Sequence, residues 1–445
     1  MSSFLDTMET NLTSSDWLSS VVGFPVSSLK IESASGEGGL SGGLMRRLIV
    51  TTSEGVEKKY VVKSIREERL EMSSDLGLAR EALLYKELGH SFSVGLPHVV
   101  FAEGDMATGS KYLIMEDLSD AVQTGYFFGP GSPLNWNKDL HAQMNRIPDA
   151  TLEEILTEAM KVAGQFHGIF WMQETLLEKS WLRGVEWMRG ENEESWKAGQ
   201  LVGSSAWEKT KSKISKASET GYTVRWSDYT VSLLEASIGK SSWLEDQARI
   251  QNVPWTLVHG DFHPANMMWR PSAVASASAS ADVAPAGQGK QRLVLLDWEA
   301  AGVGNGAQDI GQYFISHMAP AQREEHEMKM LRVYYDTLIA HKTSSSSTSS
   351  TGDSTNNISR TSASSSSNAS SSSSISQAQV HVAAVEYTWE MCVQDYIRGG
   401  SERWVWLLCL LSGMCPDPMV QYFHDQFEAF CKHHGVTPAS IGMPR

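Results

Sequence analysis

Apolar and polar residues alternate along the first part of the chain, in segments separated by glycine-rich or acidic turns. This period-two pattern predicts strands at residues 28–35, 44–53, 57–65, 97–105 and 110–120, because successive side chains of a strand point to opposite faces. One helical pattern interrupts them at 75–90, DLGLAREALLYKELGH, where apolar residues recur every three to four positions. The first 120 residues are therefore predicted to form a small, mostly β unit.

Long helical patterns dominate from residue 150 onward. Helices are predicted at 151–171, 322–342, 380–398 and 418–435. The strongly apolar run WVWLLCLLSGM at 404–414 is too short to span a bilayer, which needs about 20 residues. It indicates a buried helix and no membrane span. The second part of the chain is therefore predicted to be larger and mostly helical.

Two low-complexity segments interrupt this part. Residues 271–290 are rich in Ala, Ser, Gly and Pro, and residues 343–376 are nearly all Ser, Thr and Asn. Neither composition buries enough apolar surface to offset the entropy of ordering, so both are predicted to be disordered insertions in surface loops. The predicted organisation is an N-terminal lobe at 20–118 and a C-terminal lobe at 119–435, the latter carrying both insertions.

Composition narrows the class of protein. The 445 residues are 41% hydrophobic and 20% charged, with a formal net charge of −15, which argues against nucleic-acid binding and fits a cationic substrate better. The four cysteines lie near the C-terminus with no CxxC pair, and the first twenty residues lack the basic and apolar regions of a secretory signal. We therefore expect a cytoplasmic protein.

The segment HGDFHPAN, residues 259–266, concentrates the candidate chemistry and allows three interpretations. His259, Asp261 and His263 at a spacing of two would suit a metal triad on an extended strand, but Gly260 and Pro264 break a regular strand. A metallophosphatase would need further metal-binding clusters in addition to this segment. A kinase catalytic loop places a base aspartate five residues before a metal-binding asparagine, and Asp261 and Asn266 have that spacing.

Further parts of a kinase occur in the required order. The apolar strand RLVLLDWEAAG ends in Asp297, where a kinase carries its second magnesium ligand, and the 271–290 insertion lies between the two metal positions, at the tip of a predicted hairpin. Lys63 ends the apolar strand YVVK, and Glu81 faces inward on the following helix and can pair with it. A glycine-rich turn at 36–43 offers backbone N–H groups to phosphates from its members Gly38, Gly39, Ser41 and Gly42.

These motifs, with IMEDL at 114–118 and QFHGIFW at 165–171, resemble the aminoglycoside phosphotransferase and choline kinase superfamily, closest to its CHK kinase-like members. The resemblance covers about residues 20–435 without the insertions. It implies a two-lobed, protein-kinase-like α+β fold and an ATP- and Mg²⁺-dependent enzyme that phosphorylates a small-molecule hydroxyl. The chain lacks an A-P-E segment, which argues against a protein kinase.

The resemblance also implies roles for single residues. Asp261 would be the base that orients the substrate hydroxyl, Asn266 and Asp297 would hold Mg²⁺, Lys63 would contact ATP phosphates and Glu81 would position that lysine. Backbone groups of Glu116 and Leu118 would contact adenine, while His259 and Asp309 would support the catalytic loop.

The substrate is the least determined part. Trp404 and Trp406 resemble the aromatic residues that enclose a quaternary ammonium in choline kinases, and core packing is the competing interpretation. Glu390 and Asp395 on the preceding helix are acidic candidates for a cationic substrate, or its solvated face. The alternative to an enzyme is a kinase-fold binding or scaffold protein, and the filled base and metal positions disfavour it.

Overall fold

The smaller, N-terminal lobe is built on one antiparallel sheet with the strand order β1-β2-β3-β5-β4. Its strands are β1 (Val26–Ser33), β2 (Leu44–Thr52), β3 (Glu57–Ser64), β4 (Val99–Asp105) and β5 (Ser110–Glu116). The computed structural model describes residues 4–33, 43–93, 95–272, 292–347 and 386–442. The five strands correspond to the five predicted from the alternating pattern.

Both faces of β5 are covered, because its side chains alternate between two apolar cores. Tyr112 and Ile114 join a cluster beneath helices α1 (Phe4–Leu12) and α2 (Ser15–Val22), while Leu113 and Met115 join the main core. Leu12 and Leu18 anchor the two N-terminal helices in the first cluster. Neither helix is among the elements that the sequence pattern predicts, since each is short and has only a few apolar residues to mark its buried face.

The helix predicted at 75–90 is two helices, α3 (Leu70–Leu76) and α4 (Arg80–Glu87). Gly77 separates them in a left-handed conformation, with φ +70°, and its N–H bonds back to carbonyl groups of the last turn of α3. The break lets α4 lie against β4 and the main core. Its buried face includes Glu81, which is 1% exposed.

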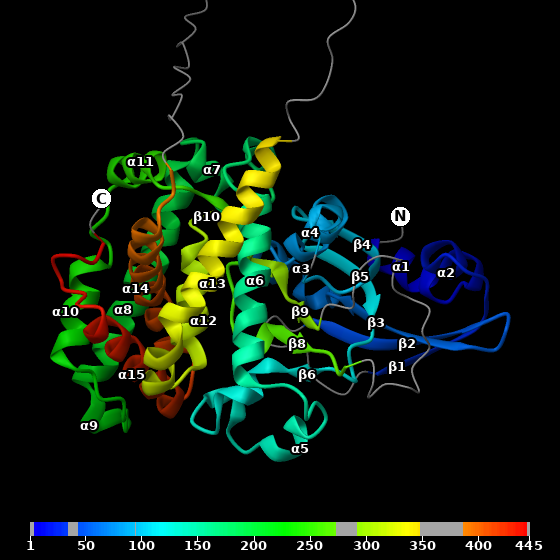
Figure 1. The fold of residues 1–445 in the computed structure, drawn as a ribbon, viewed down its shortest axis with the longest axis horizontal. Coiled ribbons are helices and arrows are strands. Elements are labelled where there is room, and N and C mark those ends of the chain that lie inside the picture. The colour runs from blue at the N-terminus through cyan, green and yellow to red at the C-terminus, as the bar shows by residue number, and fades with distance from the viewer. Residues whose placement is uncertain (1–3, 34–42, 94, 273–291, 348–385, 443–445) are drawn as a thin grey trace, which may run out of the picture.

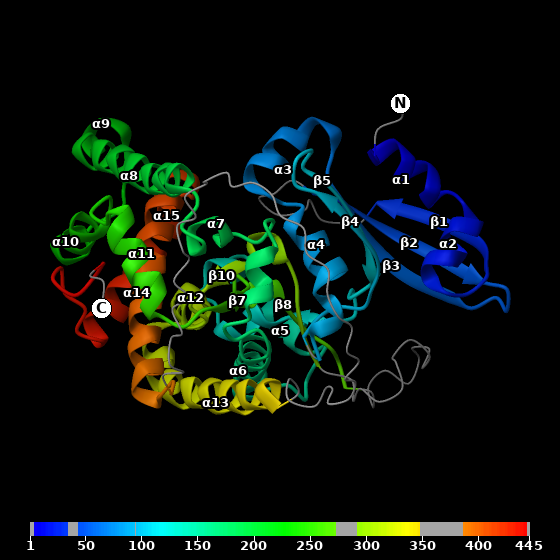
Figure 2. The same cartoon turned by 90° about the horizontal axis from the view of Figure 1, so that it is seen from above.

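The larger lobe is helical and lies beside the sheet (Figures 1 and 2). Its longer helices are α6 (Leu152–Ile169), α8 (Glu193–Ser215), α10 (Asp228–Ser237), α11 (Trp243–Asn252), α12 (Ala307–His317), α13 (Pro320–Ser347), α14 (Trp389–Met414) and α15 (Asp417–His433). Shorter elements are β6 (Val122–Gln123), α5 (Leu140–Met144), α7 (Val185–Met188) and α9 (Ala217–Thr220). The molecule is thus a two-lobed, protein-kinase-like α+β fold, as predicted.

Helices α6 and α13 cross closely through glycine on α6. A Cβ on Gly164 would lie 2.7 Å from the carbonyl oxygen of Tyr334, and one on Gly168 would lie 2.8 Å from that of Leu338. Helix α6 begins at a capping box, in which Thr151 and Glu154 bond each other's backbone. Helix α13 runs to Ser347, past the end at 342 that the pattern predicts, and the rest of the serine-rich segment lies outside the described residues.

The apolar run at 404–414 continues a longer helix rather than forming a separate one. Helix α14 passes through Gly399 and Gly400 without a break, although the pattern predicts an end at 398. Gly400 is where α12 packs on α14, since a Cβ on Gly311 of α12 would lie 2.4 Å from the Gly400 Cα. Tertiary packing therefore outweighs the low helix propensity of this pair. Within the described ranges, no helix is both long and apolar enough to cross a membrane.

Candidate active site

Two short antiparallel ladders bracket the HGDFHPAN loop. Strand β7 (Thr256–Val258), before the loop, pairs with β10 (Gly302–Gly304), and β8 (Met267–Trp269), after it, pairs with β9 (Leu293–Leu295). The loop and residues 296–301 therefore run side by side. The N–H of Leu296 donates to the carbonyl oxygen of Asn266 at 2.8 Å, which brings Asn266 beside Asp297.

Asp309, on the first turn of α12, supports the start of the loop. Its carboxylate accepts from the N–H of His259 at 2.7 Å and from the N–H of Gly260 at 3.1 Å. His259 is fully buried; its Nδ1 accepts from the N–H of Asp261 and its Nε2 lies 2.9 Å from the carbonyl oxygen of Leu296. Both ring nitrogens are engaged within the protein, so His259 is not arranged as a metal ligand.

Asp261 lies at the centre of a polar cluster and keeps 41% of its side chain exposed. Its Oδ1 accepts from Gln312 Nε2 at 2.7 Å, and its Oδ2 lies 3.2 Å from Asn266 Nδ2 and 3.3 Å from His263 Nε2. Burial opposes ionisation, but the charge and hydrogen bond of His263, with smaller effects of His259 and Arg403, hold the pKa of Asp261 well below its ordinary value. Asp261 is therefore a carboxylate near neutral pH.

Asp297 faces the loop from the other strand and reaches across to the N-terminal lobe. Its backbone is left-handed, with φ +66°, and its Oδ1 accepts from Lys63 Nζ at 2.9 Å. Lys63 Nζ also lies 2.8 Å from Glu81 Oε2. Burial disfavours the charge of Lys63, yet the neighbouring carboxylates outweigh it and raise its pKa well above the ordinary value. Lys63 is thus a fixed positive charge at the junction of the lobes.

A second lysine joins this network, and the sequence analysis did not identify it. Lys111 of β5 is completely buried, with its Nζ 2.8 Å from Glu81 Oε2 and 2.5 Å from Glu299 Oε1. Glu299 also lies 3.3 Å from Lys63 Nζ. Burial opposes ionisation of Glu81, but Lys111 and Lys63 lower its pKa to about 2. The signal available in the sequence was a lysine in phase with Leu113 on an otherwise apolar strand.

Several oxygen atoms at the loop suit a divalent cation. Carboxylate oxygens of Glu81, Asp297 and Glu299 lie within 4.8 Å of one another, and oxygen ligands are those that Mg²⁺ prefers. Asn266 directs its Nδ2 toward Asp261, so its carbonyl oxygen is turned away from that carboxylate. The side chain of Asp297 is 38% exposed. Asn266 and Asp297 stay the predicted metal-holding residues.

Only some of the residues expected to contact the nucleotide belong to the described part of the chain. Gly38, Gly39, Ser41 and Gly42 lie outside the described residues. Leu118 follows β5, and its N–H makes no hydrogen bond within the described part of the chain, whereas its carbonyl accepts from Ala121. Glu116 makes two hydrogen bonds within the protein. Its N–H donates to the carbonyl oxygen of His98, and its carboxylate accepts from Arg270.

A cavity of about 250 Å³ opens next to the catalytic loop. Its lining includes Trp187, Trp196, Asp246, Asp395, Glu402 and Arg403. Arg403 connects the cavity to the loop, because its Nη2 donates to the carbonyl oxygen of Gly260 and its Nε to Gln312. Asp395 is held by Asn305 at 2.9 Å and by the Tyr387 hydroxyl at 3.1 Å. Of the predicted substrate residues, Asp395 thus reaches this cavity.

The other three predicted substrate residues lie elsewhere or are already occupied. Trp404 is 1% exposed and packs on Phe423 in the core, and Glu390 is exposed near the start of α14. The ring of Trp406 has the guanidinium carbon atoms of Arg183 and Arg403 at 5.6 and 5.9 Å from its centroid. The described residues therefore do not form an open cage for a quaternary ammonium at these tryptophans, because core side chains and arginines take those positions.

Arg183, which no sequence motif marks, adds positive charge beside the loop. Burial, together with the like charges of Arg403 and Arg80, lowers its pKa to about 10, while Asp261 acts in the opposite direction. Its guanidinium makes no hydrogen bond or ion pair to any residue that the structure describes. Its charge acts on Asp261, and Arg183 is not among the residues that line the cavity.

Comparisons with known proteins give one family match and several structural similarities. Residues 249–351, which contain the whole HGDFHPAN loop and Asp297, match the model of a family of unknown function, DUF1679, described as "Uncharacterized oxidoreductase dhs-27". No curated protein matches the chain.

Among solved structures, the chain is similar to a choline kinase from Cryptosporidium parvum Iowa II, with 10% identity, 97% of each chain covered and a TM-score of 0.41. A Plasmodium vivax ethanolamine kinase shares 12% identity over 91% of this chain and 82% of that one, with a TM-score of 0.37. A macrolide 2'-phosphotransferase from Brachybacterium faecium shares 13% identity over 75% of this chain and 88% of that one, with a TM-score of 0.34.

Proposed function

We propose that this protein transfers the γ-phosphoryl group of ATP to a hydroxyl group of a small molecule. The observation that carries the proposal is the convergence of Asp261, Asn266 and Asp297 on two paired segments, with the buried Lys63–Glu81 ion pair directly across from Asp297. Phosphoryl transfer depends on positioning and on neutralising phosphate charge, and needs little covalent chemistry from the protein.

In this mechanism Asp261 accepts a hydrogen bond from the substrate hydroxyl and aims its oxygen at the γ-phosphorus. Gln312 and Asn266 fix the carboxylate from two sides, so it is orientated before the substrate arrives. Its depressed pKa makes it a weak base in the ground state, which suits a group that orients the hydroxyl and takes its proton late, when the bond to phosphorus is already forming.

Lys63 contacts the ATP phosphates, and Glu81 with Lys111 holds that lysine in place. The carbonyl oxygen of Asn266 and the carboxylate of Asp297 would hold Mg²⁺, which supplies positive charge to the phosphates when bound. The N–H of Leu118, which makes no hydrogen bond within the described residues, would donate to adenine. The ladder of β8 and β9 sets the separation of Asn266 and Asp297.

We further propose that the acceptor substrate enters the cavity beside Arg403. Its aromatic walls, Trp187 and Trp196, and its acidic and basic lining suit a compact polar molecule with an apolar face. The lining carries three acidic residues, Asp246, Asp395 and Glu402, and three basic residues, Arg249, Arg398 and Arg403, so its charge suits a polar acceptor of either sign.

The test is ³¹P NMR of the purified protein with Mg-ATP and pooled sugars, sterols, amino alcohols and aminoglycosides. A new phosphate-ester signal is expected from the native protein and from Asp336→Asn, a surface control on α13. Asp261→Asn should lose the signal while ATP binding, followed by calorimetry, remains largely intact. Near-native transfer by Asp261→Asn would refute the assigned role, and Mg-ATP binding without turnover of any acceptor would favour a nucleotide-binding scaffold.

A further inference from the structure

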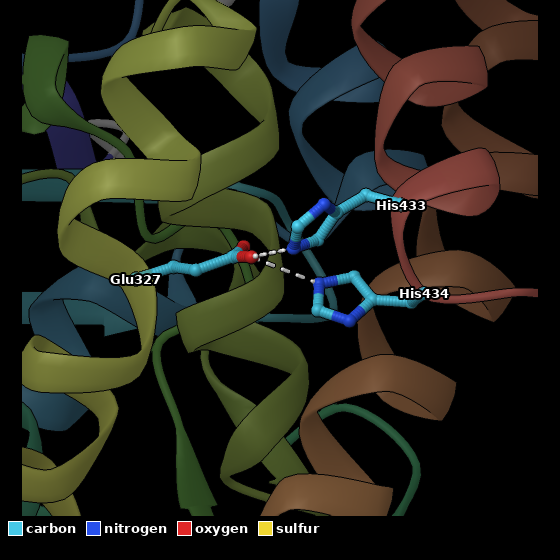
Figure 3. Close-up of side chains that lie close together, drawn as sticks. All are labelled: Glu327, His433 and His434. Carbon is cyan, nitrogen blue, oxygen red and sulfur yellow. Dashed lines mark ion pairs between the residues drawn. The ribbon is translucent and has the colours of Figure 1, made fainter.

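Three potential metal ligands meet where the C-terminal helix ends against α13, outside the Asp261 cluster. Glu327 projects from α13, His433 is the last residue of α15 and His434 follows it (Figure 3). Glu327 Oε1 lies 3.1 Å from His433 Nε2 and 3.2 Å from His434 Nε2. The three donor atoms all lie within 4.8 Å of one another.

The two contacts are ion pairs when the histidines are protonated, drawn as dashed lines in Figure 3, and they do not meet the geometry of a hydrogen bond. Glu327 Oε1 and His434 Nε2 are both buried, and neither has a hydrogen-bond partner among the described residues. At 3.2 Å, the ring N–H direction must therefore miss the carboxylate oxygen. A buried carboxylate oxygen and a buried ring nitrogen that make no hydrogen bond of good geometry are costly. Donor atoms that converge without pointing at one another are what a bound cation between them would satisfy.

The ligand types and spacings select zinc. Zn²⁺ binds imidazole nitrogen and carboxylate oxygen at about 2.0–2.2 Å, so the edges of its tetrahedron are about 3.4 Å long, close to the two distances seen here. Two histidines and one glutamate also leave a fourth position for water. Mg²⁺ and Ca²⁺ prefer oxygen ligands and are poorly served by two imidazoles. The metal expected at Asn266 and Asp297 therefore does not compete for this site.

Neighbouring groups hold the ligands in orientation. Glu327 is 0% exposed, and its second oxygen, Oε2, accepts from the Tyr396 hydroxyl at 2.8 Å and lies 3.5 Å from Arg323 Nε, which leaves Oε1 directed at the histidines. His433 Nδ1 lies 3.7 Å from Glu324 Oε1, on the side that keeps Nε2 turned inward. The side chain of His433 is 38% exposed, so an ion has a path from solvent.

We propose that Glu327, His433 and His434 form a zinc site that fastens the end of α15 to α13. The site joins two helices of the larger lobe, and its fourth position stays open to water. Helix α13 packs in turn on α6, the helix that supplies His167, whose Nε2 lies 3.4 Å from Asp309 behind the catalytic loop.

The experiment uses the full chain, loaded with Zn²⁺, freed of excess metal by gel filtration and analysed by plasma mass spectrometry. One equivalent of zinc is expected in the native protein and in the control His326→Gln, which changes the residue next to Glu327 on α13. That equivalent should be lost from Glu327→Gln and from the double variant His433→Gln/His434→Gln. Co²⁺ in place of Zn²⁺ should give the intense visible absorption of a four-coordinate site in the native protein and in His326→Gln, and not in the ligand variants.

Circular dichroism establishes that each variant is folded. Glu327 is buried, so Glu327→Gln can fail to fold. The single change His433→Gln, at a partly exposed position, is the second test, and it should weaken zinc binding at least tenfold. The melting temperature of the native protein should rise with added Zn²⁺, and that rise should disappear in the folded variants. Absence of zinc from the folded native protein would overturn the proposal, as would an equivalent of zinc that persists in the variants.

Discussion

The buried lysine Lys111 offers the sharpest quantitative test of the site. Together with Lys63 it faces three carboxylates, Glu81, Asp297 and Glu299, so the network has two positive and three negative charges and a formal charge of −1. The change Lys111→Met fills a similar volume but leaves Lys63 as the sole cation, and the formal charge becomes −2. Removing one partner of a buried ion pair costs about 3–5 kcal/mol, and we expect a loss in that range.

The assay is urea unfolding of the native protein and its variants at pH 7, with the change in free energy of unfolding taken from the midpoint. Lys86→Met is the matched control, since Lys86 pairs with Glu103 at 2.7 Å with both side chains well exposed, and such pairs contribute at most about 1 kcal/mol. The double variant Lys111→Met/Glu299→Gln returns the formal charge to −1 and should recover most of the loss.

Two results would refute this reasoning. If Lys111→Met costs no more than Lys86→Met, the network does not depend on a second cation. If the effects of Lys111→Met and Glu299→Gln simply add, the two side chains are not energetically coupled at 2.5 Å, and the pair does not act as the structure indicates.

Two further predictions concern the catalytic loop. Gly260→Ala should cost at least about 1–2 kcal/mol from its left-handed backbone alone, and it should impair phosphotransfer further because the new Cβ would lie 2.2 Å from the Ala300 carbonyl oxygen; unfolding and turnover within twofold of native would contradict this. Burial lowers the pKa of His263, but Asp261 outweighs it and raises that pKa above the ordinary value. The ion pair of His263 with Asp261 therefore stabilises the fold fully below about pH 6.5, and this stabilisation is lost as pH rises through the folded-state pKa of His263. The stability difference between native protein and His263→Gln, measured by urea unfolding, should therefore shrink between about pH 6 and pH 9, and a difference that grows with pH would exclude this ion pair.

The sequence predicted the elements whose periodicity is strong and missed those that depend on distant contacts. Five strands follow from the alternation of polar and apolar residues, and helices α6, α13 and α15, with the inward face of Glu81, follow from the helical period. Helices α8, α10, α11 and α12 were not predicted. Helices α1 and α2 are too short to show a clear period. The break at Gly77 and the continuity of α14 through Gly400 depend on packing partners that lie far away in the chain.

The residues of the candidate site also fall into those that the sequence predicted and those that it missed. Asp261, Asn266 and Asp297 were found because phosphoryl transfer requires particular residue types at particular spacings. Lys111, Gln312 and Arg183 belong to no motif that the sequence shows, so only the fold brings their side chains to the site. Trp404 and Trp406 were judged by residue type alone, and neighbouring side chains decide whether an aromatic ring is open to a ligand.

The pairing of β8 with β9 makes the relative position of Asn266 and Asp297 independent of the length of the segment that joins the two strands. The N–H of Arg270 donates to the carbonyl of Arg292 at 2.8 Å, so the two ends of the first low-complexity segment are tied together by the ladder itself. The register of Asn266 against Leu296 is set within the ladder and does not depend on what joins its open end. This junction is therefore a natural position for a reporter domain or an affinity tag, and for shortening the chain to a tight turn, with Asn266 and Asp297 left in place.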